Sequence, residues 1–515
     1  MQSSPTSKTL LSKKNLLLFI LLMLAFSVSR LYALSADIPI WSISHYSPID
    51  EFYYTPAAFD VVEGIHSPSG TLLSPPYSAY NMVEQFITAG SLLLFGDNYF
   101  GLRLPSVLAG MIVLACFYTL ILKRFGLLSA VLFCTVLISE LSFTLATRIA
   151  EPTIFRMAAA AVILLVFAHK NYTARSHIFM LGIAISIAWL FIYPTNAFLG
   201  LFALIVLLAG NLDKPISSTA TYAIGALVGA CIYLLCFYAL GHSISDFLTT
   251  KSILSGRIAD ERSNVFVQMV LKILAIRNAS FFSSHVYFLI ASIISLAVLT
   301  LLAFFNNRRV THIDKVVLVF VLCFLLQCAF INDYPERKLV FILPVCLYLC
   351  LFLAHLLLDR LPRIYSTPLL VGTALTTATL FAIPTFKNVY AAPQYSYQNA
   401  MKDLTFLNGQ RVIGGWSYGF RLYNDYKPYL NQYALVYTQS EYYYRQLTDA
   451  GRRNEALYTF EYGDEKAEHA MNAAGFYKER VIFRTNDPVY PDMYLYKFNA
   501  LSTPEPEPHA EQDAR

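Results

Sequence analysis

The sequence predicts a polytopic α-helical membrane protein with about eleven transmembrane helices and an extracytoplasmic α/β domain near its C-terminal end. Three observations predict this fold class. Hydrophobic residues make up 56% of the 515 residues and charged residues only 14%, whereas average soluble domains contain about 25% charged residues. Long apolar runs recur through most of the chain. From Lys387 onward, the composition becomes that of a water-soluble domain.

The net charge of +5 does not indicate a nucleic-acid partner. In membrane proteins Lys and Arg collect in cytosolic loops, so they report orientation and not ligand. The eight cysteines all fall inside apolar runs, which argues against a disulfide framework or a cysteine zinc site. No motif indicates a cofactor, and a role for a divalent cation is left open.

The first apolar run, Leu16–Leu34, follows Lys8, Lys13 and Lys14. Its length favours a retained helix over a signal peptide, because signal-peptide apolar cores have about 7–15 residues. Arg30, near the far end, is expected to extend its charged group outward to water. The further runs long enough to span are Leu104–Leu122, Leu127–Ala146, Thr153–Ala168, Ile178–Tyr193, Ala197–Leu212, Thr219–Leu240, Val286–Phe305, Val316–Ile331, Leu339–Leu357 and Pro368–Ile383.

Basic residues in the short loops predict the orientation of the chain. Lys123 with Arg124, and Arg360 with Arg363, fall in loops on the N-terminal side. The N-terminus is therefore expected in the cytosol and the C-terminus outside. The loop of residues 35–103 holds seven acids and no Lys or Arg before Arg103, so it is expected to face outward.

The chain is expected to have three parts: a transmembrane domain over residues 1–386, an extracytoplasmic α/β domain over 387–499 and a tail over 500–515. The tail is rich in Pro and acids, which predicts disorder. Within the membrane domain, the outer loop 241–285 has an amphipathic pattern that predicts an interfacial helix. The candidate strands are Arg411–Gly415, Tyr433–Tyr437, Leu457–Tyr462, Arg480–Arg484 and Met493–Lys497, and the candidate helices are Tyr397–Leu407, Glu441–Ala450 and Glu465–Ala474.

Asp50 and Glu51 have two interpretations. In the first, Ser47-Pro48-Ile49-Asp50 starts a helix, and the acids complement its dipole by about 0.3–1 kcal/mol each. In the second, the acids are catalytic. The loop lacks basic residues, so a carboxylate there would have no local salt-bridge partner, and partial desolvation would raise its pKa toward a value suited to accepting a hydroxyl proton. The local sequence leaves both interpretations open.

Tyr53 and Tyr54 follow these acids at helical spacing. Their rings and hydroxyls are suited to orienting a sugar. An interfacial aromatic belt is an equally good explanation.

A second cluster lies at the turn between two spans, with Arg148, Glu151 and Arg156 at their outer ends. Glu151 is expected to pair with either arginine, and ion pairing with snorkelling explains the cluster without function. Glu140 lies deeper in the same span. Intramembrane acids are costly, so Glu140 is either functional or hydrogen-bonded to a neighbouring helix.

A third cluster places Arg337 and Lys338 at a late outer turn. Two cations at the outer interface suit a lipid phosphate, with Arg as a bidentate fork and Lys as a point charge. Ordinary lipid-headgroup contact is the alternative explanation.

Four segments resemble one known group of proteins. They are I-D-E-F-Y-Y in the first outer loop, F-G-D-N-Y-F-G-L-R-L-P-S-V-L-A-G, A-T-R-I-A-E-P and Y-P-E-R-K-L-V-F-I-L-P. In this order they resemble the GT-C superfamily of membrane glycosyltransferases, in its protein O-mannosyltransferase and aminoarabinose-transferase branch (glycosyltransferase family 39 and relatives).

The resemblance implies transfer of a sugar, with inversion, from a polyprenyl- or dolichyl-phosphate donor at the extracytoplasmic face. It implies that Asp50 is the catalytic base, Glu51 its acidic neighbour and Glu151 the acid of the second outer loop. Arg103 matches the arginine at the start of the second span, and Arg103 and Arg148 are both expected to contact the substrate or its phosphate. Arg337 matches a late arginine near the donor phosphate, and since relatives often have R-Y at Arg337-Lys338, which cation meets the phosphate stays open.

The implied acceptor is a hydroxyl of a glycan, lipid or protein, and the implied location is the plasma membrane of a bacterium. Two other classes fit some features: a transporter or lipid-linked glycan flippase, and a glycan polymerase or ligase. Glu140 and Gln327 favour the transporter, whose polar groups belong near the bilayer midplane. The ionisable residues at the outer ends of the spans favour the transferase.

Overall fold

The computed structural model describes most of the predicted membrane domain and the strands of the C-terminal domain. The described residues are 13–36, 51, 55–63, 82–169, 174–192, 194–210, 214–239, 286–330, 340–391, 393, 395, 398–399, 402, 404–409, 411–413, 427–430, 457–461, 476–484 and 494–500. The chain divides into two compact units, Met1–Gln394 and Tyr395–Arg515. The first unit therefore extends beyond residue 386, where we predicted the boundary.

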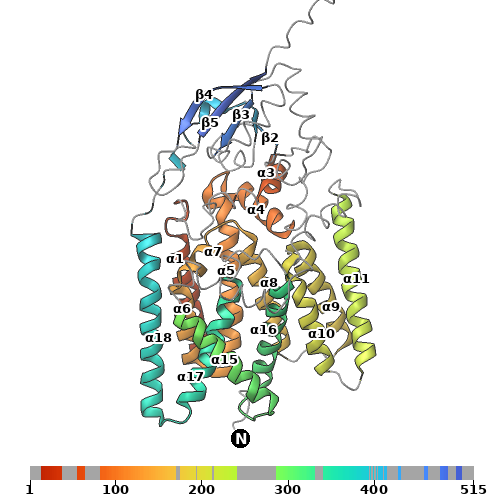
Figure 1. Cartoon of the computed structure of the whole chain (residues 1–515), viewed down its shortest axis with the longest axis vertical. Coiled ribbons are helices and arrows are strands. Elements are labelled where there is room, and N and C mark those ends of the chain that lie inside the picture. Colours follow the sequence, from red (N-terminus) through yellow and green to blue (C-terminus); the bar gives the residue numbers. More distant parts are fainter. Residues whose placement is uncertain are drawn as a thin grey trace, which may run out of the picture. The chain divides into compact units, whose positions relative to one another are not determined.

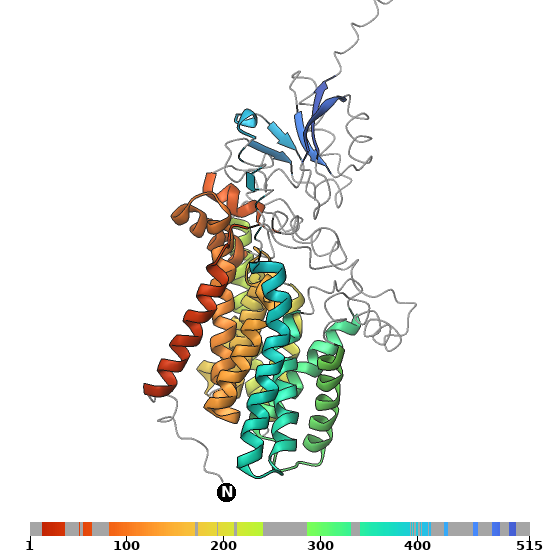
Figure 2. The same ribbon diagram turned by 90° about the vertical axis from the view of Figure 1, so that its left-hand side faces the viewer.

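The described part of the first unit is helical, and its long helices run side by side (Figures 1 and 2). Each predicted apolar run coincides with a helix or with consecutive helical segments. The α-helices are α1 (Lys13–Leu31), α3 (Pro56–Glu63), α4 (Met82–Phe95), α5 (Tyr99–Phe125), α6 (Leu127–Ser139), α7 (Leu141–Ala146), α8 (Pro152–Ala168), α9 (Arg175–Ser186), α10 (Phe198–Gly210), α11 (Pro215–Ala239), α15 (Val286–Phe304), α16 (His312–Phe330), α17 (Leu343–Leu358) and α18 (Arg363–Thr385). The π-helical segments η3 (Ile187–Ile192) and η6 (Phe386–Tyr390) extend α9 and α18.

Six of the described helical segments are long and apolar enough to cross a membrane: α1, α5, α9 with η3, α11, α17 with the residues before it, and α18 with η6. Helices α4, α6, α8, α10 and most of α15 are apolar but shorter. The chain is an integral membrane protein, and the count of eleven spans stays a prediction.

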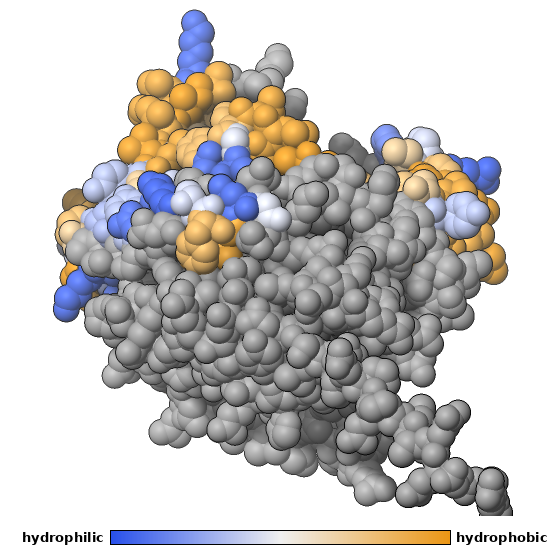
Figure 3. All heavy atoms as spheres, turned by 90° about the horizontal axis from the view of Figure 1, so that it is seen from above, coloured by the Kyte–Doolittle hydropathy of each residue, from blue (hydrophilic) through white to orange (hydrophobic). Residues whose placement is uncertain are grey.

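Hydrophobic side chains cover the outside of several of these helices. Leu235 and Tyr238 on α11 and Ile364 on α18 are more than two thirds exposed. Seen from above, many of the described side chains at the edge of the view are hydrophobic (Figure 3). Exposed apolar side chains are unfavourable in water but not against lipid tails, so these helix surfaces are suited to contact lipid.

Glu140 divides the run Leu127–Ala146, which we predicted as one continuous span. Its backbone is extended, and its Oε2 accepts a hydrogen bond from the Phe143 amide at 2.6 Å. Glu140 is thus the N-cap of α7 and satisfies an amide that the helix start leaves without a partner. Of the two explanations offered for this acid, the structure supports a hydrogen-bonding role.

Helices α9 and α11 pack closely because glycines line their interface. A Cβ added at Gly225 would collide with the backbone of Phe179, and one added at Gly182 would lie 2.7 Å from the Ala226 nitrogen. Ser186 Oγ donates to the Ala226 carbonyl at 2.7 Å across this contact. Small residues at such spacing are typical of close helix packing in membranes.

The second unit contains a mixed five-stranded sheet in the order β2-β1-β3-β5-β4. Strand β1 pairs in parallel with β2 and β3, and β5 pairs antiparallel with β3 and β4. The strands are β1 (Arg411–Ile413), β2 (Lys427–Leu430), β3 (Leu457–Glu461), β4 (Phe476–Arg484) and β5 (Tyr494–Ala500).

Four of these strands overlap predicted ones, whereas β2 was not predicted. It contains Pro428 and is an edge strand, a position where proline is tolerated. Ala500 belongs to β5 and not to the tail. The predicted strand Tyr433–Tyr437, most of the predicted helices, the tail beyond 500 and the loop 241–285 lie outside the described residues, so the α/β assignment stays a prediction.

Candidate functional site

Glu51 forms a buried ion pair with Arg103 at the start of α5. Arg103 Nη2 lies 2.7 Å from Glu51 Oε2, and Arg103 Nε lies 2.8 Å from Glu51 Oε1. The Ala150 amide, in the turn before α8, also donates to Oε1 at 2.9 Å. Our expectation that an acid of this loop lacks a basic partner is therefore wrong for Glu51. A bidentate pair fixes geometry as well as charge, so Glu51 joins the first outer loop to two helices.

Arg103 also holds the chain that leaves α1. Its Nη1 donates to the carbonyl oxygens of Leu34 at 2.8 Å and Ala36 at 2.5 Å. Its guanidinium lies over the Tyr99 ring, 4.1 Å from the centroid. Arg103 is 2% exposed, and these contacts give it a structural role. Its predicted contact with substrate or phosphate stays a prediction.

Arg148 binds the C-terminal end of α1. Its guanidinium donates to the carbonyl oxygens of Arg30 at 2.8 Å, Tyr32 at 2.7 Å and Ala33 at 2.6 Å. The last carbonyls of a helix have no partner within it and carry partial negative charge, so a cation there is stabilising. Arg148 is 3% exposed, which is incompatible with snorkelling. Its predicted phosphate contact stays a prediction.

Arg30 does not extend outward to water, as we expected, but is fully buried. Its Nε donates to Thr147 Oγ1 and its Nη2 to the Ile138 carbonyl, each at 2.8 Å. The Phe26 ring lies 4.9 Å from its guanidinium carbon. The side chain turns inward because the end of α6 and the turn after α7 supply the acceptors that a buried guanidinium needs.

Glu84 is a buried acid near the start of α4 that we did not single out from the sequence. It is 1% exposed, and neither of its carboxylate oxygens has a hydrogen-bond partner. Burial raises the pKa of Glu84 well above its usual range, and the nearby Glu151 carboxylate raises it further. The raised pKa favours the protonated form of Glu84, and a protonated carboxyl can donate a hydrogen bond. The sequence offers one signal, because Glu84 is the one charged residue of α4.

Glu151 and Arg156 lie at the start of α8. Glu151 is 2% exposed and accepts a hydrogen bond from Thr153 Oγ1 at 3.0 Å. Arg156 is fully buried, and its guanidinium carbon lies 5.2 Å from the centroid of the Phe341 ring. Snorkelling is therefore wrong for Arg156 as well. Burial of charged groups at this end of the bundle marks it as a candidate functional site.

Five predicted site residues lie outside the described residues. These are Asp50, Tyr53, Tyr54, Arg337 and Lys338. Glu51, the residue after Asp50, is described. Val340 is the first described residue after Arg337 and Lys338. Within the described ranges, no group of three or more His, Cys, Asp or Glu side chains is arranged to hold a metal ion.

Comparison with known proteins agrees with this architecture. Residues 80–238 match the sequence model of the dolichyl-phosphate-mannose-protein mannosyltransferase family. The crystal structure of ArnT from Cupriavidus metallidurans bound to undecaprenyl phosphate has a similar fold, with a TM-score of 0.59 and 13% sequence identity over 93% of this chain and 97% of that chain. The chain is thus similar to a family of membrane glycosyltransferases over residues 80–238, and its fold is similar to that of ArnT. No curated protein sequence matches it.

The apo structure of the same ArnT gives a TM-score of 0.60 with 11% identity, again over 93% of this chain and 97% of that one. At these identities the likeness shows the fold alone and not the substrates. The family match spans α4 to α11 and so includes Glu84, Arg103, Arg148 and Glu151. Arg156 also lies within the matched part, whereas Arg30 and Glu51 precede it.

Proposed function

We propose that the chain transfers a sugar from a polyprenyl-phosphate-linked donor to an acceptor hydroxyl, with inversion at the anomeric carbon, on the extracytoplasmic face of a bacterial plasma membrane. The acceptor is a glycan, a lipid or a protein. The catalytic base is Asp50, and the cations that meet the donor phosphate are Arg337 and Lys338.

One observation carries this proposal: the loop that bears Asp50 is held at the next residue. Glu51 binds Arg103 on α5 and the Ala150 amide before α8. A catalytic group needs a fixed position relative to its substrate, because small displacements are costly in rate. The Glu51 pair supplies such a fixed point, so Glu51 is a positioning residue and Asp50 the group that takes the proton.

A lipid-linked donor suits a transferase that works outside the cytosol. Nucleotide sugars are cytosolic, so an outward-facing enzyme needs a sugar that has crossed the membrane on a lipid carrier. The ArnT structure with a similar fold contains undecaprenyl phosphate, a carrier of this class. The apolar, lipid-facing helices of the first unit give such a donor access from within the bilayer.

The chemistry balances without a further reactant. The acceptor hydroxyl loses its proton to Asp50, and its oxygen forms a bond to the anomeric carbon. The bond from that carbon to the phosphate oxygen breaks, and polyprenyl phosphate leaves with the electron pair. Arg337 or Lys338 stabilises the charge that develops on the departing phosphate.

Transport is less well supported. The polar residues that favoured it were Glu140 and Gln327. Glu140 caps α7, and Gln327 Oε1 accepts from the amide of Phe198, the first residue of α10, at 2.9 Å. Both side chains therefore bind helix N-terminal amides, which explains their presence without a transported substrate.

The test is incubation of the purified full chain, in lipid vesicles, with a panel of polyprenyl-phosphate sugars and acceptor lipids or glycans. We expect one donor to be consumed, and Asp50→Asn to slow transfer by about 10²- to 10⁴-fold, the usual contribution of a general base. The anomeric configuration of the product, measured by NMR, is expected to be opposite to that of the donor.

Asp60→Asn is the matched control, because it makes the same change to another acid of the same loop. It is expected to keep most of the activity. Near-normal transfer by a folded Asp50→Asn protein would reject Asp50 as the base. Consumption of no donor, together with substrate-dependent transport into vesicles, would reject the transferase.

A further inference from the structure

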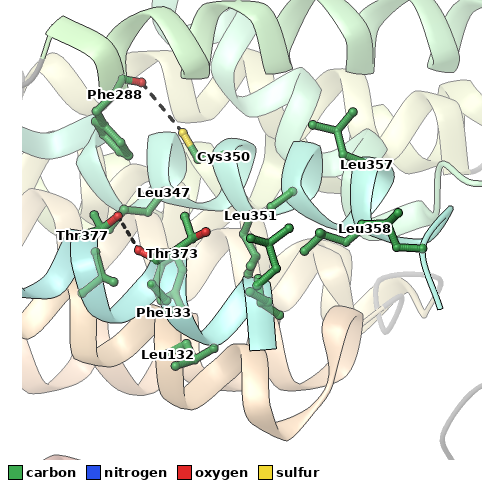
Figure 4. A pocket seen from close by; sticks show the side chains of 16 residues that line it. Leu132, Phe133, Phe288, Leu347, Cys350, Leu351, Leu357, Leu358, Thr373 and Thr377 are labelled. Carbon is green, nitrogen blue, oxygen red and sulfur yellow. Dashed lines mark hydrogen bonds between the residues drawn. The ribbon is translucent and has the colours of Figure 1, made fainter. Parts of the chain in front are cut away.

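A cavity of about 440 Å³ lies between α6, α15, α17 and α18 (Figure 4). Leucines dominate its lining, among them Leu132, Leu351, Leu358 and Leu369. Its hydroxyls include that of Thr377, which donates to the Thr373 carbonyl at 2.9 Å. No described buried side-chain atom that lacks a partner belongs to its lining. The cavity is therefore suited to hydrocarbon and not to water.

The cavity extends to the end of the bundle that lies away from the candidate site. Its lining includes Leu361, in the turn between α17 and α18. His355, in the last turn of α17, stacks on Phe125 at the end of α5, with ring centroids 4.7 Å apart. Arg103 lies near the other end of α5, which is about 33 Å away at 1.5 Å per helical residue.

Positive charge lies beside the mouth of the cavity. Arg360 and Arg363 are exposed in the turn that also contains Leu361. Asp359 is exposed there too, so the turn has a net charge of one positive unit. Arg363 is the first residue of α18, and a helix N-terminus attracts phosphate through its free amides and its dipole. Two guanidiniums with an apolar cavity beside them match a phosphate group attached to a hydrocarbon chain.

We infer that the α17–α18 turn and this cavity bind one anionic phospholipid of the cytosolic leaflet. Its phosphate contacts Arg360 and Arg363, and one acyl chain lies in the cavity. The volume fits, because an apolar cavity of about 150 Å³ holds one benzene, so 440 Å³ holds a chain of roughly 18 carbons. Residues Arg363 to Thr377 of α18 cover about 21 Å, more than the roughly 15 Å of one leaflet.

This site is separate from the proposed transfer reaction. The donor phosphate is proposed to lie at the opposite end of the bundle, near Arg337 and Lys338. The site therefore holds a structural lipid, and its occupancy is measurable without any sugar donor.

Native mass spectrometry of the full chain, released from vesicles of phosphatidylglycerol and phosphatidylcholine with identical acyl chains, tests the inference. We expect one phosphatidylglycerol to be retained in preference to phosphatidylcholine. The double variant Arg360→Gln/Arg363→Gln is expected to weaken this binding about 25-fold, since each arginine near the lipid surface contributes a factor of about five. Ala374→Phe, which fills the cavity, is expected to abolish it.

Two controls match these changes. Arg308→Gln/Arg309→Gln removes two exposed arginines from the turn between α15 and α16, neither of which lines the cavity. Leu375→Phe enlarges an exposed α18 side chain that does not line it either. Both are expected to retain the lipid. Equal retention of the two phospholipids, equal loss in either control, or displacement of phosphatidylglycerol by undecaprenyl phosphate would overturn the inference. The last result would assign the cavity to the donor's tail.

Discussion

Three arginines at the end of the bundle that holds the candidate site bind backbone carbonyls of other segments. Arg103 and Arg148 together bind carbonyls between Arg30 and Ala36, and Arg30 binds the Ile138 carbonyl. Guanidinium groups suit this role because they present several donors in a fixed plane and stay charged. The acceptors lie in the last turn of a helix or just after it, where carbonyls lack helical partners. Charge here orders the loops that carry the candidate site.

The Glu51–Arg103 pair is expected to behave as a unit in unfolding experiments. Glu51→Gln or Arg103→Met alone leaves a buried charge without its partner, which costs about 3–5 kcal/mol. The double variant is expected to cost less than the sum of the single variants by more than about 1 kcal/mol. The measurement is the free energy of unfolding of all four proteins in mixed micelles. Additive losses would show that the two side chains do not interact.

Glu84→Gln is expected to raise stability and lower transfer. The pKa of Glu84 is raised in the folded protein. Glu84 therefore lowers the stability of the folded state as pH rises above the unfolded pKa of about 4.3, and this loss of stability grows until the folded carboxyl ionises. Glutamine removes this cost while keeping the shape of the protonated acid. A group retained at such a cost serves function, so we expect transfer to fall about tenfold or more.

Ser91→Ala is the control for Glu84→Gln, because Ser91 is another buried side chain of α4 without a partner. It is expected to leave transfer unchanged. Normal transfer by Glu84→Gln in vesicles would exclude Glu84 from the site, and a fall in its unfolding temperature at pH 8 would contradict the assignment of a costly buried carboxyl.

At the scale of elements, close approach of α9 and α11 depends on Gly225. Gly225→Ala places a methyl group against the Phe179 backbone, which cannot yield as a side chain can. We expect a loss of about 1–3 kcal/mol or more, measured as a lower thermal midpoint in detergent. Gly372→Ala in α18 is the matched control, since nothing lies within 4 Å of its added Cβ, and a slight gain is expected from helix propensity. A midpoint for Gly225→Ala equal to that of the control would contradict the packing.

The helices were predictable because apolar runs of this length have few alternatives to membrane helices. The break at Glu140 was not, because an N-cap glutamate inside an apolar run looks the same in sequence as an acid that faces another helix. Strand β2 was not predicted because it contains Pro428, which is rare in strands other than edge strands. These errors arise where a single side chain decides between two local structures.

The candidate site was predicted only in part. Arg103 and Glu51 were each singled out, but they are 52 residues apart, and no local pattern shows that they pair. Glu84 was overlooked because its significance lies in burial without a partner, which only tertiary structure reveals.

At the scale of the whole molecule, stability is expected to depend on pH through Asp97, in the turn between α4 and α5. Burial raises the pKa of Asp97 to about 7, against about 3.9 when unfolded. Between these values the folded state holds a proton that the unfolded state has lost, so stability falls as pH rises from about 4 to about 7 and is then constant.

Asp97→Asn removes this dependence. Its gain in unfolding free energy is expected to be larger at pH 8 than at pH 5.5 by up to about 2 kcal/mol at full burial, and by less for this partly exposed side chain. Differential scanning fluorimetry of the two proteins at both pH values measures the difference. A gain that is equal at both pH values, or larger at pH 5.5, would contradict the raised pKa of Asp97.

The contacts of α1 also set an order of events during synthesis. Arg30 is made first, but its acceptor Thr147 lies 117 residues later. At the usual 5–20 residues per second, that separation is about 6–24 s of translation. Throughout this interval Arg30 lacks this acceptor, so we expect the first helix to stay at the aqueous edge of the insertion machinery. We therefore expect α1 to take its final position in the bilayer only after α7 has been made, although α1 is synthesised first.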